Sequence, residues 1–258
     1  NAEKITLYRQ IIKTYAIYDG IYGAPKIAAE LQKLKIACSV STVSRAMRIL
    51  GIKSAVSEQF KPRKSTMSLE ERGQIANLIK GLKLTRINQV WTTDITYIKT
   101  KKEGFVYLIS FIDLFSKKVV AWKLSRTQNT ADILAVLKNA VEIRKPKPGL
   151  IIHSDKGAQM RSNDYRAYLA KKRIIASYTS LDHSCDENAA QESFHASLKK
   201  EYIYRETLLN YIEAYSCVYR YIECFYNTKR IHSSINYLTP NEFEKRLNNP
   251  YIFSNLSV

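Results

Sequence analysis

The first fifty residues place apolar side chains at helical spacing in three consecutive stretches. These stretches are residues 3–17, 23–34 and 39–50, and turn-forming residues separate them. The third stretch begins at serines that suit a helix N-cap, either Ser39 or Ser41. The pattern therefore predicts a small all-α unit of three helices.

The third of these helices has two unlike faces. One face is apolar, and the other carries short polar and basic side chains: Ser41, Ser44, Arg45 and Arg48. Such side chains reach phosphates and base edges when a helix enters the major groove. We therefore predict a helix-turn-helix DNA-binding domain over residues 1–52. The alternative is an ordinary three-helix bundle with a solvated charged face.

A basic segment follows the three helices. Residues 53–66 lose helical periodicity and carry the cations Lys61, Arg63 and Lys64, which suit a chain lying along a phosphate backbone. A helical period returns at Leu69–Leu82. We expect residues 53–88 to form a basic linker that includes a helix.

From residue 90 the apolar runs become short, as is typical of strands. Three runs stand close enough together for a meander, and two further runs alternate with helical stretches. In chain order the expected strands are 90–98, 105–112, 119–124, 150–152 and 174–177, with helices at 131–143 and 164–171. This order predicts an α/β domain over residues 89–204, built on a mixed five-stranded sheet with helices on both faces.

A helical extension is expected over residues 205–258. Its aromatic and apolar residues from Tyr211 to Tyr226 recur at helical spacing. This spacing favours packing in the core or between subunits over stacking on bases.

Three carboxylates occupy positions that suit a metal site. Asp94 interrupts the first strand of the sheet, and Asp155 directly follows the short fourth strand. Glu192 shares one face of a strongly helical stretch with Lys199. Carboxylates of this kind hold Mg²⁺ in phosphoryl-transfer sites. Each acid also has a plain structural alternative, and Asp113 is a rival for the site.

Charge and cysteine content narrow the class of protein. The 258-residue chain has a net charge of +18, from 41 Lys and Arg against 23 Asp and Glu. This excess is typical of polyanion binders, among which a ribosomal-type protein is the alternative. The four cysteines form no C-x-x-C pair, and no apolar run approaches the length of a membrane span. We expect a cytoplasmic protein with reduced thiols and no structural zinc.

Five segments resemble the integrase-type catalytic core of bacterial insertion-sequence transposases, in order and in spacing. They are WTTDITYI, YLISFIDLFSKKVVAW, IIHSDKGAQ, ENAAQESFHASLKKE and CFYNTKRIHSSINYLTPNEF. The resemblance covers roughly residues 20–246. It is strongest to the group whose full-length enzyme is made from two reading frames and which transposes through an excised circle.

The resemblance implies an RNase H-like fold and a catalytic Asp-Asp-Glu triad at Asp94, Asp155 and Glu192. It implies Mg²⁺ as the cofactor, with Mn²⁺ able to substitute, and a DNA contact by Lys199 near the reacting end. Arg230 and His232 either fix a loop or touch DNA. The chain departs from the family pattern in the loop LDHSCDEN before Glu192, and the interval between Asp155 and Glu192 is one residue longer than usual.

The expected function is that of a transposase which cleaves and transfers strands at the ends of an insertion sequence. Its partner is double-stranded DNA, both element ends and target, and the active species is a homodimer or larger. A DNA-binding regulator with an inactive integrase-like core is the alternative. An RNase H-type nuclease would explain the core but leave the helix-turn-helix pattern unexplained.

Overall fold

The computed structural model describes residues 2–57, 77–155, 157–179 and 188–248. The chain divides into two compact units, residues 1–70 and 71–258. None of the described helices is long and apolar enough to cross a membrane.

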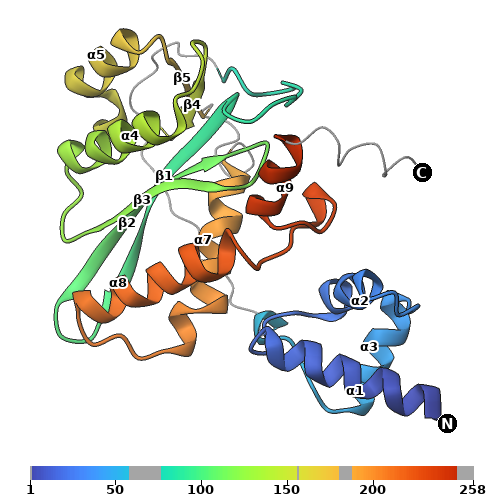
Figure 1. Ribbon diagram of the computed structural model, residues 1–258. Coiled ribbons are helices and arrows are strands. Elements are labelled where there is room, and N and C mark those ends of the chain that lie inside the picture. Colours follow the sequence, from blue (N-terminus) through green and yellow to red (C-terminus); the bar gives the residue numbers. More distant parts are fainter. Residues whose placement is uncertain (1, 58–76, 156, 180–187, 249–258) are drawn as a thin grey trace. The chain divides into compact units, whose positions relative to one another are not determined.

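In its described residues, 2–57, the first unit has three α-helices (Figure 1): α1 (Ala2–Ile17), α2 (Ala24–Lys33) and α3 (Val40–Ile49). Helix α3 is capped by Ser39, whose hydroxyl accepts the amide of Thr42 at 3.1 Å. A short 3-10 turn, η1 (Ala55–Ser57), follows. This segment is tied back to the helices, because Ser54 donates its hydroxyl to the carbonyl of Ile21 at 2.7 Å. The predicted all-α unit is confirmed.

The second unit is built on one five-stranded sheet with the strand order β3-β2-β1-β4-β5. The strands are β1 (Val90–Thr100), β2 (Gly104–Asp113), β3 (Val119–Ser125), β4 (Ile151–Ser154) and β5 (Ile175–Tyr178). The first three strands pair antiparallel, whereas β4 pairs parallel with both β1 and β5. The predicted mixed sheet is confirmed.

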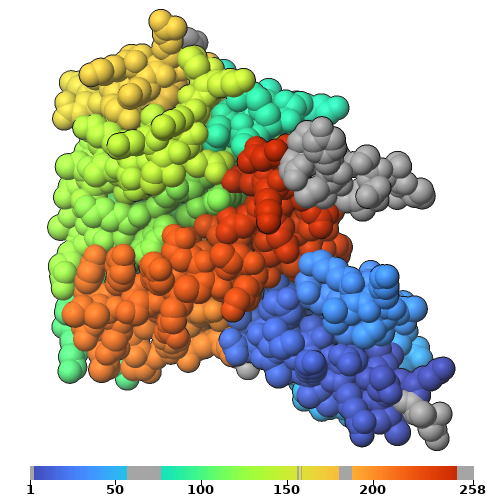
Figure 2. All heavy atoms as spheres, in the orientation of Figure 1, coloured from blue at the N-terminus to red at the C-terminus, as the bar shows by residue number. Residues whose placement is uncertain are grey.

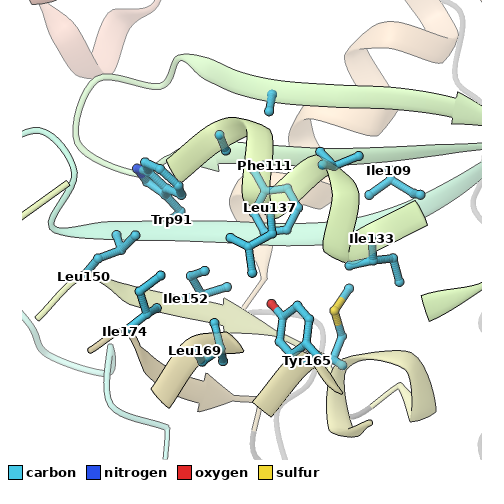
Figure 3. Close-up of a cluster of buried hydrophobic side chains, with 14 of the residues drawn as sticks. Trp91, Ile109, Phe111, Ile133, Leu137, Leu150, Ile152, Tyr165, Leu169 and Ile174 are labelled. Carbon is cyan, nitrogen blue, oxygen red and sulfur yellow. The ribbon is translucent and has the colours of Figure 1, made fainter. Parts of the chain in front are cut away.

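One face of the sheet is covered by α4 (Thr130–Arg144) and α5 (Asn163–Lys171). Because successive strand residues point to opposite faces, Trp91, Ile109 and Phe111 all face these helices. Figure 3 shows their side chains packed with Leu137 and other residues of the two helices. This cluster is the hydrophobic core of the second unit.

The other face of the sheet carries α7 (Ala189–Glu201) and α8 (Tyr211–Tyr219). Helix α8 continues as a π-helix, η4 (Arg220–Tyr226), and α9 (Pro240–Leu247) comes last. The described residues of this unit also form three short 3-10 turns: η2 (Ala158–Arg161), η3 (Ile203–Arg205) and η5 (Ser233–Ile235).

The aromatic run of the C-terminal extension divides between core and surface. Ile222 and Tyr226 are buried, in agreement with core packing. Tyr215 and Tyr219 are 43% and 45% exposed, which leaves them available to a partner.

Helix α9 is joined to the rest of the unit by a buried ion pair. Arg144 at the end of α4 donates two hydrogen bonds of 2.7 Å to the carboxylate of Glu244. The hydroxyl of Ser116, in the turn between β2 and β3, donates to the same carboxylate at 2.8 Å. Helix α9 is therefore fastened to segments about 100 residues or more away in the chain.

The predicted helix Leu69–Leu82 is wrong in its described part. Residues 77–82 form turns, and Gly81 has φ +74, a left-handed backbone conformation that ends helices. Residues 69–76 lie outside the described part of the chain. The apolar spacing of residues 69–82 suggested a helix, but Leu78 and Leu82 are exposed residues outside any helix.

Candidate active site

Asp94 lies within β1, on the face of the sheet that α7 covers. It stands opposite Ser110 of β2, and its side chain is 27% exposed. The amide of Ile95 donates to its Oδ1 at 2.8 Å. The carboxylate is thus held near the middle of a strand rather than at a loose strand end.

Asp155 follows directly after β4, which pairs parallel with β1. Its Oδ1 accepts the amide of Gly157 at 3.1 Å. A Cβ at position 157 would lie 3.0 Å from the same oxygen, so this close approach of backbone to carboxylate favours glycine. Asp155 therefore lies at the carboxyl end of the strand, where the amide of Gly157 holds its carboxylate.

Glu192 is an exposed residue in the first turn of α7, and its neighbour Gln191 anchors that turn. Gln191 is fully buried, and its amide group donates to the carbonyls of Thr92 at 2.8 Å and Ser110 at 3.2 Å. The Ser110 hydroxyl donates back to the Gln191 carbonyl oxygen at 3.0 Å. Glu192 is consequently fixed beside β1, the strand that carries Asp94, and its neighbour β2.

The electrostatics of Asp94 show that the three acids are neighbours. Burial is the largest effect and raises the pKa of Asp94, and the negative charges of Asp155 and Glu192 raise it further. The amide of Ile95 and the charge of Lys199 oppose this rise, and the resulting pKa is about 7. Among the described residues, no three His, Cys, Asp or Glu side chains are already arranged as a metal-binding cluster. Asp155 and Glu192 are therefore close enough to Asp94 for their charges to act on it.

His195 is a site residue that the sequence reasoning missed. Its Nδ1 lies 3.5 Å from Oδ2 of Asp94. Burial, helped by the charge of Lys199, lowers the pKa of His195 to about 3, so the imidazole is neutral. A sequence signal was present, because Glu192, His195 and Lys199 are spaced by three and four residues and share one helix face.

Lys199 lies beside the acids, as the helical spacing predicts. Its ammonium group is 4.7 Å from the centre of the Tyr97 ring. Burial lowers its pKa, and the charge of Asp94 partly offsets this effect. The cation is therefore half-buried at the edge of the carboxylate group.

Asp113, the rival for the site, has a structural role. Its fully buried carboxylate accepts the amides of Asn88 at 2.6 Å, Phe115 at 2.8 Å and Ser116 at 3.1 Å. Its side chain also lies on the opposite face of the sheet from Asp94, because it pairs with Trp91. These bonds stabilise the turn between β2 and β3.

Arg230 directs most of its guanidinium hydrogen bonds to a buried carboxylate. Its guanidinium donates to both carboxylate oxygens of Glu201 at 2.8 Å, and the Glu201 side chain is 2% exposed. The His232 ring lies edge-on to Tyr226, with 4.9 Å between the ring centres. These contacts support the loop-fixing alternative for both residues, and the DNA-contact alternative stays a prediction.

The remaining predicted DNA-binding residues belong to the first unit and its linker. On α3 the polar stripe is exposed along its whole length: Ser41, Ser44, Arg45 and Arg48. The opposite side of that helix is buried through Val43 and Met47. The linker cations Lys61, Arg63 and Lys64 lie outside the described residues, as do residues 181–187 of the loop LDHSCDEN.

Different family models match the amino-terminal helices and the α/β unit. Residues 85–184 match the integrase core domain family, and residues 192–247 match a second integrase core domain family. Residues 2–60 match the HTH-like domain family. A retroviral structure, the HTLV-2 integrase catalytic core domain in complex with magnesium (dimeric form), is 16% identical with a TM-score of 0.45. The match covers 61% of this chain and 96% of that one.

Two curated relatives match nearly the whole chain. The transposase for insertion sequence element IS904 of Lactococcus lactis subsp. lactis (strain IL1403) is 34% identical over 244 residues, 94% of this chain and 95% of the relative. Transposase InsF for insertion sequence IS3A of Escherichia coli (strain K12) is 34% identical over 228 residues, 87% of this chain and 77% of the relative. The chain therefore belongs to the insertion-sequence transposases related to IS3 and IS904, enzymes of the polynucleotidyl transferase type with an HTH-like domain and an integrase core.

Proposed function

We propose that Asp94, Asp155 and Glu192 form the catalytic triad of this transposase and hold divalent metal ions, Mg²⁺ or Mn²⁺. One observation carries the proposal: Asp94 lies on the sheet face under α7, where both other acids are close enough to raise its pKa. A cation relieves the repulsion that Asp94 receives from the other two carboxylates, and oxygen donors are the ligands that Mg²⁺ prefers. The donor set therefore fits the metal.

Bound metal would supply charge stabilisation at the attacking and leaving oxygens of the phosphoryl transfer. The chain's own residues position the reactants. The Ile95 amide orients the Asp94 carboxylate, and the neutral His195 ring lies beside it. Gln191 fixes the helix turn that carries Glu192, and Lys199 presents a cation to the DNA phosphates. A preorganised site of this kind leaves little rearrangement for the transition state.

The reaction has two steps at phosphorus. In the first, a water oxygen attacks the phosphodiester at the element end, the P–O3′ bond breaks, and the leaving oxygen takes up a proton as a 3′-hydroxyl. In the second, that hydroxyl loses its proton and attacks another phosphodiester. A new P–O3′ bond forms as the P–O3′ bond of the attacked strand breaks, and the released oxygen takes up a proton as a 3′-hydroxyl. Neither step requires a covalent bond between protein and DNA.

The first unit would recognise the element ends. The exposed stripe of α3 presents two hydroxyls and two guanidinium groups, which suit phosphate and base-edge contacts. The linker cations Lys61, Arg63 and Lys64 would follow the phosphate backbone. Because two DNA ends must be held while one triad acts, the active species would be at least a homodimer. An enzyme that works on a bacterial chromosome belongs in the cytoplasm, bound to the nucleoid.

The test uses three variants that remove charge without adding bulk: Asp94→Asn, Asp155→Asn and Glu192→Gln. A labelled duplex carrying the element's terminal repeat is incubated with the full chain and Mg²⁺ or Mn²⁺. Each variant should lose cleavage and strand transfer while it keeps its affinity for the end. Asp164→Asn, at an exposed acid in the first turn of α5, is the matched control and should remain active. Full strand transfer by any one of the three variants would remove that residue from the triad.

A further inference from the structure

A hollow of about 660 Å³ opens between the C-terminal ends of α4 and α5. These helices occupy the upper left of the face shown in Figure 2, in yellow-green and yellow. Five of its lining residues are lysines, which define what we call the lysine hollow: Lys138, Lys145, Lys147, Lys171 and Lys172. Glu142 is the single acid in the lining.

The lining residues of the hollow keep an excess of four positive charges, because Glu142 offsets one of the five lysines (5 − 1). In the part of the chain that the structure describes, none of the five ammonium groups is paired with a carboxylate. Three lysines elsewhere are paired in this way: Lys33 with Glu30, Lys118 with Glu244, and Lys123 with Asp132. Because like charges repel, five clustered cations are unfavourable unless an anion offsets them.

The hollow is held in shape by the backbone and by one aromatic ring. Helix α4 is followed by the C-cap residue Lys145, whose φ of 44 is a left-handed conformation that turns the chain, and the proline ring fixes the backbone at Pro146. The two loops that leave α4 and α5 are joined by a hydrogen bond of 3.0 Å from Gly149 to Arg173. The ammonium of Lys138 lies 5.7 Å from the centre of the Tyr168 ring. The lysines are thus carried by backbone segments that are held in place relative to each other.

The hollow is distinct from the carboxylate site. Its residues end the helices that lead into β4 and β5, whereas Asp155 follows the opposite end of β4. Strand β4 has four residues, which at about 3.3 Å each separate the two strand ends by about 13 Å. A phosphate group bound in the hollow is therefore not the one that reacts at the three acids.

We propose that the lysine hollow binds the phosphate backbone of duplex DNA, independently of sequence, on a segment away from the reacting phosphodiester. Unpaired, compact ammonium groups on fixed elements are suited to phosphate oxygens, and DNA is the polyanion that a transposase handles. The proposal rests on the proposed function only for its choice of DNA. A plainer explanation is that lysines at helix ends stabilise the helix dipoles, and the two differ in what they predict for DNA binding.

The test compares two adjacent lysine pairs in the full chain. Lys171→Gln/Lys172→Gln removes two charges from the hollow, and Lys101→Gln/Lys102→Gln removes two exposed charges from the turn between β1 and β2. Binding to a random-sequence duplex is measured over a range of salt concentrations. The slope of log affinity against log salt should become shallower by about 1.8 for the hollow pair, at about 0.9 per lost phosphate contact. It should not change for the control pair.

A second measurement needs no substitution. Lysine acetylation of the parent protein is followed by mass spectrometry with and without the duplex, and the five lysines of the hollow should be protected more than Lys101 and Lys102. Equal slope changes in both pairs would reduce the effect to net charge and overturn the proposal. A lower melting temperature of Lys171→Gln/Lys172→Gln with an unchanged salt slope would show that these lysines only stabilise the helix dipole, and would overturn the proposal. The same acetylation experiment is repeated with polyglutamate in place of the duplex. Protection of the five lysines by polyglutamate but not by duplex would assign the hollow to an acidic polypeptide instead. Cleavage by the parent protein in the same buffer reports on the proposed function separately.

Discussion

Gln191→Leu isolates the contact that fixes the acid-bearing helix to the sheet. The side chain of Gln191 is fully buried and exchanges three hydrogen bonds with Thr92 and Ser110. Leucine has a similar volume, so the substitution removes these bonds without opening a large cavity. The expected loss therefore comes from polar groups left without partners.

The size of this loss follows from the groups involved. The Ser110 hydroxyl loses its acceptor, and the carbonyls of Thr92 and Ser110 each lose a donor. A buried polar group without a partner costs about 1–3 kcal/mol, so we expect the free energy of unfolding to fall by about 2–5 kcal/mol. For a unit of this size the melting temperature should fall by about 5–15 °C.

A double-mutant cycle attributes the loss to the bond with Ser110. Ser110→Ala removes the hydroxyl that Gln191→Leu leaves unpaired, so the double variant should be more stable than the sum of the single effects by about 1 kcal/mol. Urea unfolding of the parent and the three variants measures these terms. Additive effects, within the error of the method, would refute the role of this bond.

The functional consequence is measured where the variant is still folded. Gln191 precedes Glu192, and a displacement of about 1 Å in a catalytic group costs on the order of 10²-fold in rate. At a temperature well below its transition, Gln191→Leu should cleave the element end far more slowly while binding it normally. Normal cleavage by a destabilised variant would show that Gln191 serves stability alone.

Three further predictions concern the ion pair of α9, the first unit and the assembly. Glu244→Gln should lower the free energy of unfolding by about 1–3 kcal/mol near neutral pH, because it removes the charge paired with Arg144 while Asp113, at 3.8 Å, remains beside the guanidinium. Burial raises the pKa of Glu244, but its bonds to Arg144 and its neighbours lower it more, to below 4.5. The parent's advantage over Glu244→Gln should therefore persist above pH 4.5 and shrink as the pH falls below it, and an advantage independent of pH would contradict this. Arg45→Ala and Arg48→Ala should weaken binding to element ends in a gel-shift assay, and unchanged binding by both would reject α3 as the recognition helix. Light scattering and co-purification of two differently tagged chains should show at least a dimer on end DNA, and strand transfer by a one-protein, one-duplex complex would exclude this.

Local pattern in the sequence predicted most of the elements. The three amino-terminal helices and the five strands lie within a few residues of their expected positions, because apolar periodicity directly reflects which side chains a helix or strand buries. The motif resemblance also led to the family to which the chain belongs. The pattern failed at Leu69–Leu82, where two exposed leucines in a turn imitate a helical stripe.

Only the tertiary structure separated residues with similar local sequence. Asp94 and Asp113 both interrupt apolar strands, and the pairing of β1 with β2 decided that Asp94 faces α7 while Asp113 faces away and stabilises a turn. Arg230 lies in a basic segment of the kind that contacts DNA. Its guanidinium is nevertheless bonded within the protein to Glu201, 29 residues earlier in the chain. His195 and Gln191 acquired their roles from β1 and β2, some 80 to 100 residues away. Periodicity reports burial along one element, whereas the partner of a buried polar group is chosen by strand register and helix packing, which no local stretch of sequence contains.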